Sequence, residues 1–226
     1  ATLFSWTGLM RSLSAVNGSW PGGRSYFKNG VWETTPRLFK GPGGYLFMGR
    51  ERVRDIHSKK QGLESNLESL AQVLRHAHKH NINTRLFVTP EHVFSIDLWQ
   101  RLGYGDLWHD FHLELIKVNE AVAREMGSAP FPLFGFNHAR GLVDEPIVRG
   151  RSASEALFTD GVHFRGALGE QIMDAVWGDQ KSSGQLLEEA SIQAYFAEVE
   201  ALREAFEFNH HEFTSGLRKK ISPEMQ

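Results

Sequence analysis

The sequence contains no cysteine among its 226 residues. This excludes disulfide scaffolds, thiolate zinc sites and cysteine nucleophiles. No run approaches the roughly 20 consecutive apolar residues that a membrane-spanning helix needs, and no signal peptide is recognisable. The formal net charge is only −2, so there is no strong positive field that would favour nucleic acid as a partner.

What remains is an ordinary globular composition, with 41% hydrophobic and 23% charged residues, which suits one domain of usual size. The chain begins with Ala1 rather than with Met. We therefore expect that further residues precede it in the parent protein. A targeting segment or membrane anchor is a candidate for that upstream part.

Hydrophobic periodicity predicts helices and strands in alternating order. Short apolar runs at residues 84–89 and 131–136 predict buried strands, the first of which is closed by Pro90. The order predicts an α/β fold, with these two strands as parallel neighbours joined by a right-handed connection. Apolar residues at helical spacing predict helices over residues 2–16, 63–77, 108–126, 165–177 and 188–208.

Two strands are fewer than a buried parallel sheet usually has. We expect either exposed apolar surface beside residues 84–89 or its coverage by the helix at 2–16. Residues 17–44 are rich in Gly, Pro and aromatics, and Asn29-Gly30 favours a short hairpin. We divide the chain into an N-terminal segment (1–60), an α/β domain (61–178) and a C-terminal helical extension (179–226).

The sharpest local pattern runs from Phe158 to Phe164, with Asp160 and His163 three residues apart before a helix. An Asp carboxylate can fix the tautomer of an imidazole, and that imidazole can deprotonate a serine hydroxyl. Spacing alone leaves a second interpretation open, in which Asp160 only caps the helix that follows.

Three stretches in order resemble the SGNH/GDSL hydrolase-like superfamily, and in particular bacterial membrane-anchored proteins with such a domain. They are the segment Asn81–His92 with its preceding helix, the segment Phe131–Phe136, and the Asp160–His163 block with the helix containing Gly169. The resemblance covers roughly residues 60–205. Only the Asp-x-x-His block is specific enough to name the superfamily.

The resemblance implies a flavodoxin-like three-layer fold, of which this chain would form the C-terminal part. It also implies a serine nucleophile and oxyanion donors that precede the observed segment. Gly105-Asp106 and Gly178-Asp179 are not followed by Ser, so only Asp160 and His163 carry over, as orienting acid and general base. The nucleophile is expected outside this chain, and the fragment alone is not expected to hydrolyse a substrate.

The implied activity is that of a serine esterase or acyltransferase on an acylated carbohydrate or a related small ester, in the cell envelope, without cofactor or metal. One alternative is the permuted order of exopolysaccharide acetylating proteins, which Gly44-Tyr45-Leu46-Phe47 faintly resembles. A second is a degenerate, non-catalytic scaffold that binds a glycan or an envelope partner. The second strand is followed by Asn137, where related proteins commonly have an acidic residue, and this supports the second alternative.

Further polar residues are candidates for the site or for metal binding. Glu91 and His92 follow the first predicted strand, at the sheet edge where ligands bind in open α/β folds, and are candidate substrate contacts. Arg140, Asp144 and Glu145 are candidates for the rim of the same cleft. Metal binding is disfavoured for the remaining histidines, since helix ends and surface positions explain them: His76 and His80, His109 and His112, and His210 and His211.

Overall fold

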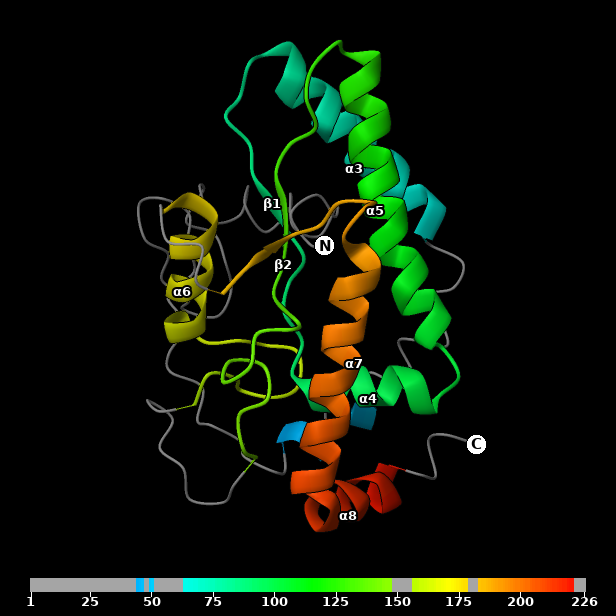
Figure 1. Ribbon diagram of the computed structural model, residues 1–226, viewed down its shortest axis with the longest axis vertical. Coiled ribbons are helices and arrows are strands. Elements are labelled where there is room, and N and C mark those ends of the chain that lie inside the picture. The colour runs from blue at the N-terminus through cyan, green and yellow to red at the C-terminus, as the bar shows by residue number, and fades with distance from the viewer. Residues whose placement is uncertain (1–43, 47–48, 51–62, 148–155, 179–182, 222–226) are drawn as a thin grey trace, which may run out of the picture. The chain divides into compact units, whose positions relative to one another are not determined.

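A computed structural model of the chain describes residues 44–46, 49–50, 63–147, 156–178 and 183–221 (Figure 1). The chain divides into two compact units, residues 1–38 and 39–226, and every described residue belongs to the second. The helix expected at 2–16 and the hairpin expected near Asn29 lie outside the described residues.

The described elements confirm the α/β class and four of the predicted helices. Two helices and one strand were not predicted, namely α4 (Val93–Arg101), α8 (His211–Ile221) and β3 (Gln185–Leu186). In chain order the elements are α3 (Leu63–Lys79), β1 (Leu86–Phe87), α4 (Val93–Arg101), α5 (Gly105–Glu125), β2 (Leu133–Gly135), α6 (Gly166–Trp177), β3 (Gln185–Leu186), α7 (Ile192–Asn209) and α8 (His211–Ile221).

The sheet has the strand order β1-β2-β3. Strands β1 and β2 are parallel, with Leu86 opposite Leu133, so the predicted parallel pair is confirmed, although both strands are shorter than the apolar runs. Strand β3 lies antiparallel to β2. The sheet is therefore mixed, because the strand that was not predicted runs antiparallel to the predicted pair. Residues 179–226 are also more than a helical extension, because they complete the sheet.

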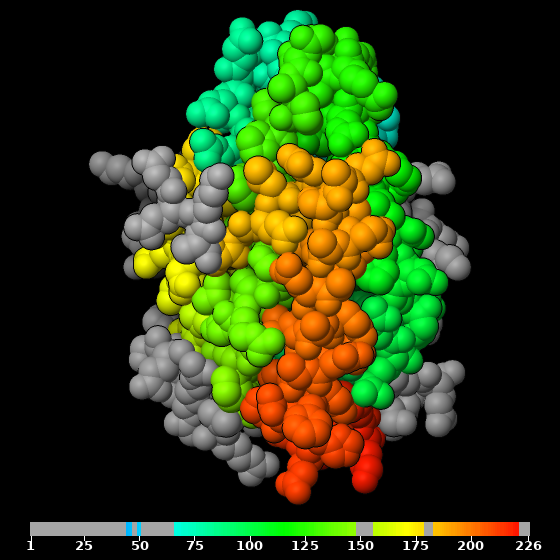
Figure 2. All heavy atoms as spheres, viewed as in Figure 1, coloured from blue at the N-terminus to red at the C-terminus, as the bar shows by residue number. Residues whose placement is uncertain are grey.

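Helices pack against both faces of this sheet. Leu86, Leu133 and Leu187 lie on the face that packs against α5 and α7, where they contact a cluster that includes Trp108 and Phe196. Phe134 and Phe136 belong to the cluster of the opposite face, together with Leu168 and Ile172 of α6. Figure 1 shows α6 on one side of the strands and α5 with α7 on the other. Figure 2 shows α7 packed between α5 and the segment that follows β2.

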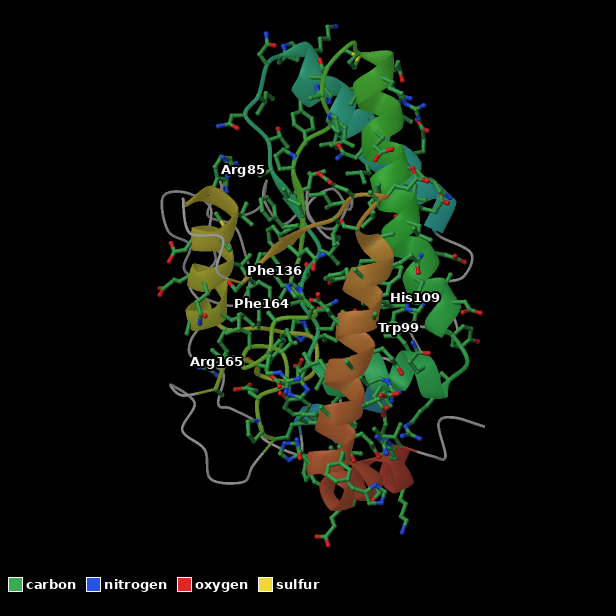
Figure 3. All side chains as sticks on the ribbon, in the orientation of Figure 1. Arg85, Trp99, His109, Phe136, Phe164 and Arg165 are labelled. Atoms are coloured by element: carbon green, nitrogen blue, oxygen red, sulfur yellow. The ribbon has the colours of Figure 1, made fainter. Side chains whose placement is uncertain are left out.

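Part of the apolar surface beside β1 is exposed, as expected from the small number of strands. Phe87 is 38% exposed and Trp177, at the end of α6, is 45% exposed. Arg85 lies beside that end of α6 (Figure 3), with its guanidinium carbon 5.0 Å from the centre of the Trp177 ring. Residues 1–16, the alternative cover for this surface, lie outside the described residues.

A buried carboxylate joins three helices at the other end of the unit. Asp97 of α4 accepts hydrogen bonds from Arg101 at 2.9 Å, from Arg203 of α7 at 2.9 Å and from Arg218 of α8 at 3.0 Å. Arg218 also pairs with Glu207 of α7. Removing a hydrogen-bonded partner from a buried charge is strongly destabilising, because part of that charge is then left uncompensated inside the protein. This cluster therefore fixes α4 against the two C-terminal helices.

None of the helices in the described part of the chain is long and apolar enough to cross a membrane.

Gly135 of β2 offers a test of the packing between the sheet and α7. A Cβ atom at this position would lie 2.8 Å from Leu187 Cδ2 and 2.8 Å from the Tyr195 hydroxyl oxygen. We predict that Gly135→Ala lowers the free energy of unfolding by about 1–3 kcal/mol, because overpacking strains a close-packed core. Urea denaturation measures this change.

Gly166→Ala is the matched control, since nothing lies within 4 Å of a Cβ atom built there and alanine favours a helix over glycine. This control should be neutral or slightly stabilising. Equal stability of the two variants would contradict the packing described for Gly135.

Candidate active site

Asp160 and His163 lie in the turn of a small hairpin that leads into α6. Phe158 and Phe164 form an isolated antiparallel bridge. The amide of Thr159 donates to the carbonyl of His163 at 2.8 Å, and the amide of Arg165 donates to the carbonyl of Leu157 at 2.7 Å. The hairpin anchors its aromatic ends in the core while its turn carries the two polar side chains.

The two side chains form a direct pair. Nδ1 of His163 lies 3.0 Å from Oδ1 and 3.0 Å from Oδ2 of Asp160. The aspartate side chain is 8% exposed and the histidine side chain 65% exposed. The pair therefore has a buried acid and an imidazole that presents most of its surface to solvent.

Asp160 also holds its own turn, but it does not cap α6, whose N-cap is Arg165 and has no side-chain hydrogen bond. Its Oδ1 accepts hydrogen bonds from the amides of Val162 at 3.0 Å and His163 at 2.9 Å. Burial alone raises the pKa of Asp160. The hydrogen bond from the His163 side chain and those from the two amides outweigh burial, so the pKa lies below its usual value. The structure therefore contains both the turn and the side-chain pair.

The geometry favours one tautomer of His163. A carboxylate beside Nδ1 accepts a hydrogen bond from the Nδ1–H group, which leaves Nε2 as the basic nitrogen of the neutral ring. This tautomer suits general-base chemistry, because Nε2 can accept a proton from a hydroxyl group or water while the carboxylate stabilises the resulting imidazolium. The buried, ionised state of Asp160 fits the orienting role.

The segment that follows β1 lies directly against this turn, as expected for residues at the carboxyl ends of strands. The carbonyl of Gly161 accepts hydrogen bonds from the His92 amide at 2.9 Å and from the Ser95 hydroxyl at 2.8 Å. Glu91 is half-buried, its amide donates to Asn137 Oδ1 at 2.9 Å, and its carboxylate accepts from Trp99 at 3.3 Å. The structure therefore brings the 91–95 segment and the Asp160–His163 turn together.

His92 is fully buried, which does not fit the expected contact with a substrate. Its Nδ1 accepts from the Phe94 amide at 3.1 Å and so caps α4, while its Nε2 contacts the Glu145 carbonyl at 2.8 Å. Burial lowers its pKa to about 4. His92 is a neutral structural residue that fixes the start of α4.

The residues proposed for the rim have three different surroundings. Glu145 is buried and accepts hydrogen bonds from the amides of Leu157 and Phe158. Asp144 accepts from the amide of Gly141. Arg140 lines an open cavity of about 540 Å³ between the segment after β2 and α6. The Glu145 side chain therefore bonds to the main chain of the hairpin inside the protein and does not line a cleft.

The other histidines do not assemble a metal site in the described part of the chain. No group of three or more His, Asp or Glu side chains there could hold a metal ion. The rings of His76 and His80 lie 4.4 Å apart. His112 is buried beside Trp108 and Phe196, and His211 is exposed beside Glu207.

Asn137 and Ser95 were missed as contributors to the site. Asn137 is buried, accepts from the Glu91 amide and donates its own amide to the Tyr195 hydroxyl at 3.1 Å. The position of Asn137, directly after a predicted strand, is the one signal that could have identified it. Ser95 carries no comparable signal, because α4 itself was not predicted.

With this geometry established, comparisons with protein-family models, with curated proteins and with solved structures find no match to the chain.

The two buried histidines predict a pH dependence of stability. Burial lowers the pKa of His92 and of His112 to about 4 in each case, whereas an unfolded histidine titrates near 6.5. Between these values the unfolded chain binds more protons, so stability falls as the pH drops. Each histidine should contribute a loss of about 3 kcal/mol over this window.

His112→Met separates one contribution from the other, because methionine fills an apolar site without titrating. We expect the plot of unfolding free energy against pH to become shallower by about 1.4 kcal/mol per pH unit between pH 4.5 and 6. Urea denaturation at several pH values measures the slope. An unchanged slope would show that His112 is protonated in the folded protein.

Proposed function

We propose that this chain is the C-terminal part of a serine esterase or acyltransferase-like protein with a flavodoxin-like three-layer α/β fold of the SGNH type. In this proposal Asp160 is the orienting acid and His163 the general base. The substrate is an acylated carbohydrate or a related small ester. The serine nucleophile comes from a part of the parent protein outside this chain.

The observation that carries the proposal is the pairing of both Asp160 oxygens with His163 Nδ1 at 3.0 Å. The carboxylate is buried and the imidazole is largely exposed, so the ring is oriented by the protein and accessible to a reactant. Geometry of this kind is the feature by which acid–base pairs are recognised across unrelated folds.

The position of the pair adds support. Ligands of open α/β proteins bind outside the carboxyl ends of the strands. The turn contacts the residues that follow β1 through the hydrogen bond from His92 to Gly161. Helices on both faces of the sheet agree with a layered α/β fold of the proposed kind.

The chemistry follows from these positions. His163 Nε2 accepts the proton of the serine hydroxyl as that oxygen attacks the acyl carbon. The imidazolium is stabilised by Asp160 and then protonates the leaving alkoxide. In the second half of the reaction the same nitrogen takes a proton from water or an acceptor hydroxyl as that oxygen attacks the acyl carbon. The imidazolium then returns the proton to the serine oxygen as the acyl group leaves it. Neither step requires a metal or an organic cofactor.

We predict that His163→Ala lowers kcat for a generic acyl ester, such as p-nitrophenyl acetate, by about a thousandfold or more in the full-length protein that contains this chain. Asp160→Asn should cost the same or less. Its Oδ1 can still accept the two amides, but its NH2 group would face Nδ1 and favour the wrong tautomer. Initial-rate kinetics measure both effects.

His211→Ala is the matched control, because His211 of α8 is also exposed and lies 3.3 Å from a carboxylate, that of Glu207. This variant should retain full activity. If His163→Ala hydrolysed the ester as fast as the His211 variant, the proposal of an acid–base pair would fail. Absence of activity in the unmodified full-length protein would favour the non-catalytic binding scaffold instead.

A further inference from the structure

The turn that carries Asp160 and His163 is held by contacts from two other segments. On one side, the Gly161 carbonyl accepts hydrogen bonds from the His92 amide and the Ser95 hydroxyl, at 2.9 and 2.8 Å. On the other side, the two oxygens of Glu145 accept hydrogen bonds from the amides of Leu157 and Phe158, at 2.9 and 2.8 Å. Both contacts lie within five residues of the pair.

Glu145 is an unusual residue for a structural role at this place. Its carboxylate is buried, and burying an ionisable group is costly unless hydrogen bonds compensate. Two main-chain amides supply such bonds, and hydrogen bonds to a charged acceptor are stronger than neutral ones. The carboxylate therefore holds the first strand of the hairpin more firmly than a neutral side chain would.

The two contacts are joined to each other. The carbonyl of Glu145 accepts a hydrogen bond from His92 Nε2 at 2.8 Å, and the amide of the same histidine donates to Gly161. A closed ring of hydrogen bonds therefore runs from Glu145 through the hairpin to Gly161, on to His92 and back. Movement of the turn would break at least one bond of this ring.

Close packing limits the turn further. A Cβ atom at Gly161 would lie only 2.2 Å from Ser95 Oγ, so the main chain of the turn rests directly on the hydroxyl. The side chain of His163 is itself largely exposed, and its Nδ1 lies 3.0 Å from both oxygens of Asp160. Its orientation depends on Asp160, and the orientation of Asp160 depends on the main chain that the ring fixes.

We propose that Glu145 and Ser95 are positioning residues for the Asp160–His163 pair, acting through the main chain of the hairpin. Glu145 fixes its first strand and Ser95 fixes its turn. This inference rests on the proposed function for its catalytic consequence, but its structural part can be tested without any enzyme assay.

The test is Glu145→Gln, which keeps the size of the side chain. Glutamine has one oxygen to accept an amide and places an NH2 group opposite the other, so the first strand loses its fixed position. We expect the pKa of Asp160, followed by carboxyl carbon NMR, to rise towards the ordinary aspartate value. The Nδ1 proton signal of His163 should broaden or disappear. Where activity is present, kcat should fall roughly tenfold to a hundredfold with little change in KM.

Asp144→Asn is the matched control, since the adjacent carboxylate bonds to Gly141 and not to the hairpin. This variant should leave the titration of Asp160 unchanged. If Glu145→Gln folds and Asp160 titrates as in the control, the positioning role is overturned, whatever happens to thermal stability.

If Glu145→Gln does not fold, Ser95→Ala is the second test variant. In Ser95→Ala the Gly161 carbonyl keeps its hydrogen bond from the His92 amide, so we expect a small cost in stability. A raised pKa of Asp160 in this variant supports the proposal, and an unchanged pKa overturns it. An inactive full-length protein that still shows these shifts would refute the esterase proposal and leave the positioning role intact.

Discussion

Buried main-chain groups must find hydrogen-bond partners, and this requirement governs the region beyond the carboxyl ends of the strands. Strands β1 and β2 contain only two and three residues, so their ladder satisfies few of these groups. Polar side chains supply the rest. The Asn137 side chain accepts a hydrogen bond from the Glu91 amide, and the Tyr195 hydroxyl accepts one from the Asn137 amide. Glu145 accepts hydrogen bonds from two amides of the hairpin. Short strands thus explain why so many polar residues are buried at this end.

The same requirement separates two histidines with opposite properties. His92 is surrounded by main-chain partners on both ring nitrogens and is neutral at physiological pH, since its pKa lies near 4. His163 has one nitrogen on a carboxylate and most of its surface in solvent. His92 therefore stabilises the main chain around it, whereas His163 faces solvent. The buried residue helps to hold the loop on which the exposed residue stands.

Much of the fold follows from the sequence because strong periodicity survives in the long helices and in the two apolar runs. Helix α4 escapes prediction for a physical reason. Its polar residues Ser95 and Asp97 are buried and alternate with Phe94, Ile96 and Leu98, which is the spacing of a strand and not of a helix. Its cap is a histidine rather than Ser, Thr, Asp or Asn. Strand β3 has two residues, too few to show alternation.

The residues of the site also divide into those that the sequence predicts and those that only the structure reveals. The Asp160–His163 pair can be found from its spacing, because residues three apart on a tight turn meet through local geometry. The buried state of His92 and the role of Glu145 cannot, since they depend on partners 53 and 12–13 positions away. Sequence position correctly placed both residues near the site. Only the packing shows that their side chains face the protein.

The Asp97 cluster has a consequence for how this chain can change over time. Its arginines stand at positions 101, 203 and 218, up to 121 residues from the carboxylate. Removing one arginine leaves the buried Asp97 carboxylate with fewer donors, which is destabilising, so we expect substitutions at these positions to be poorly tolerated. These four positions should be inherited as a set even where the surrounding sequence has diverged. They offer a mark, spread along the chain, by which remote relatives can be recognised when no continuous stretch remains similar.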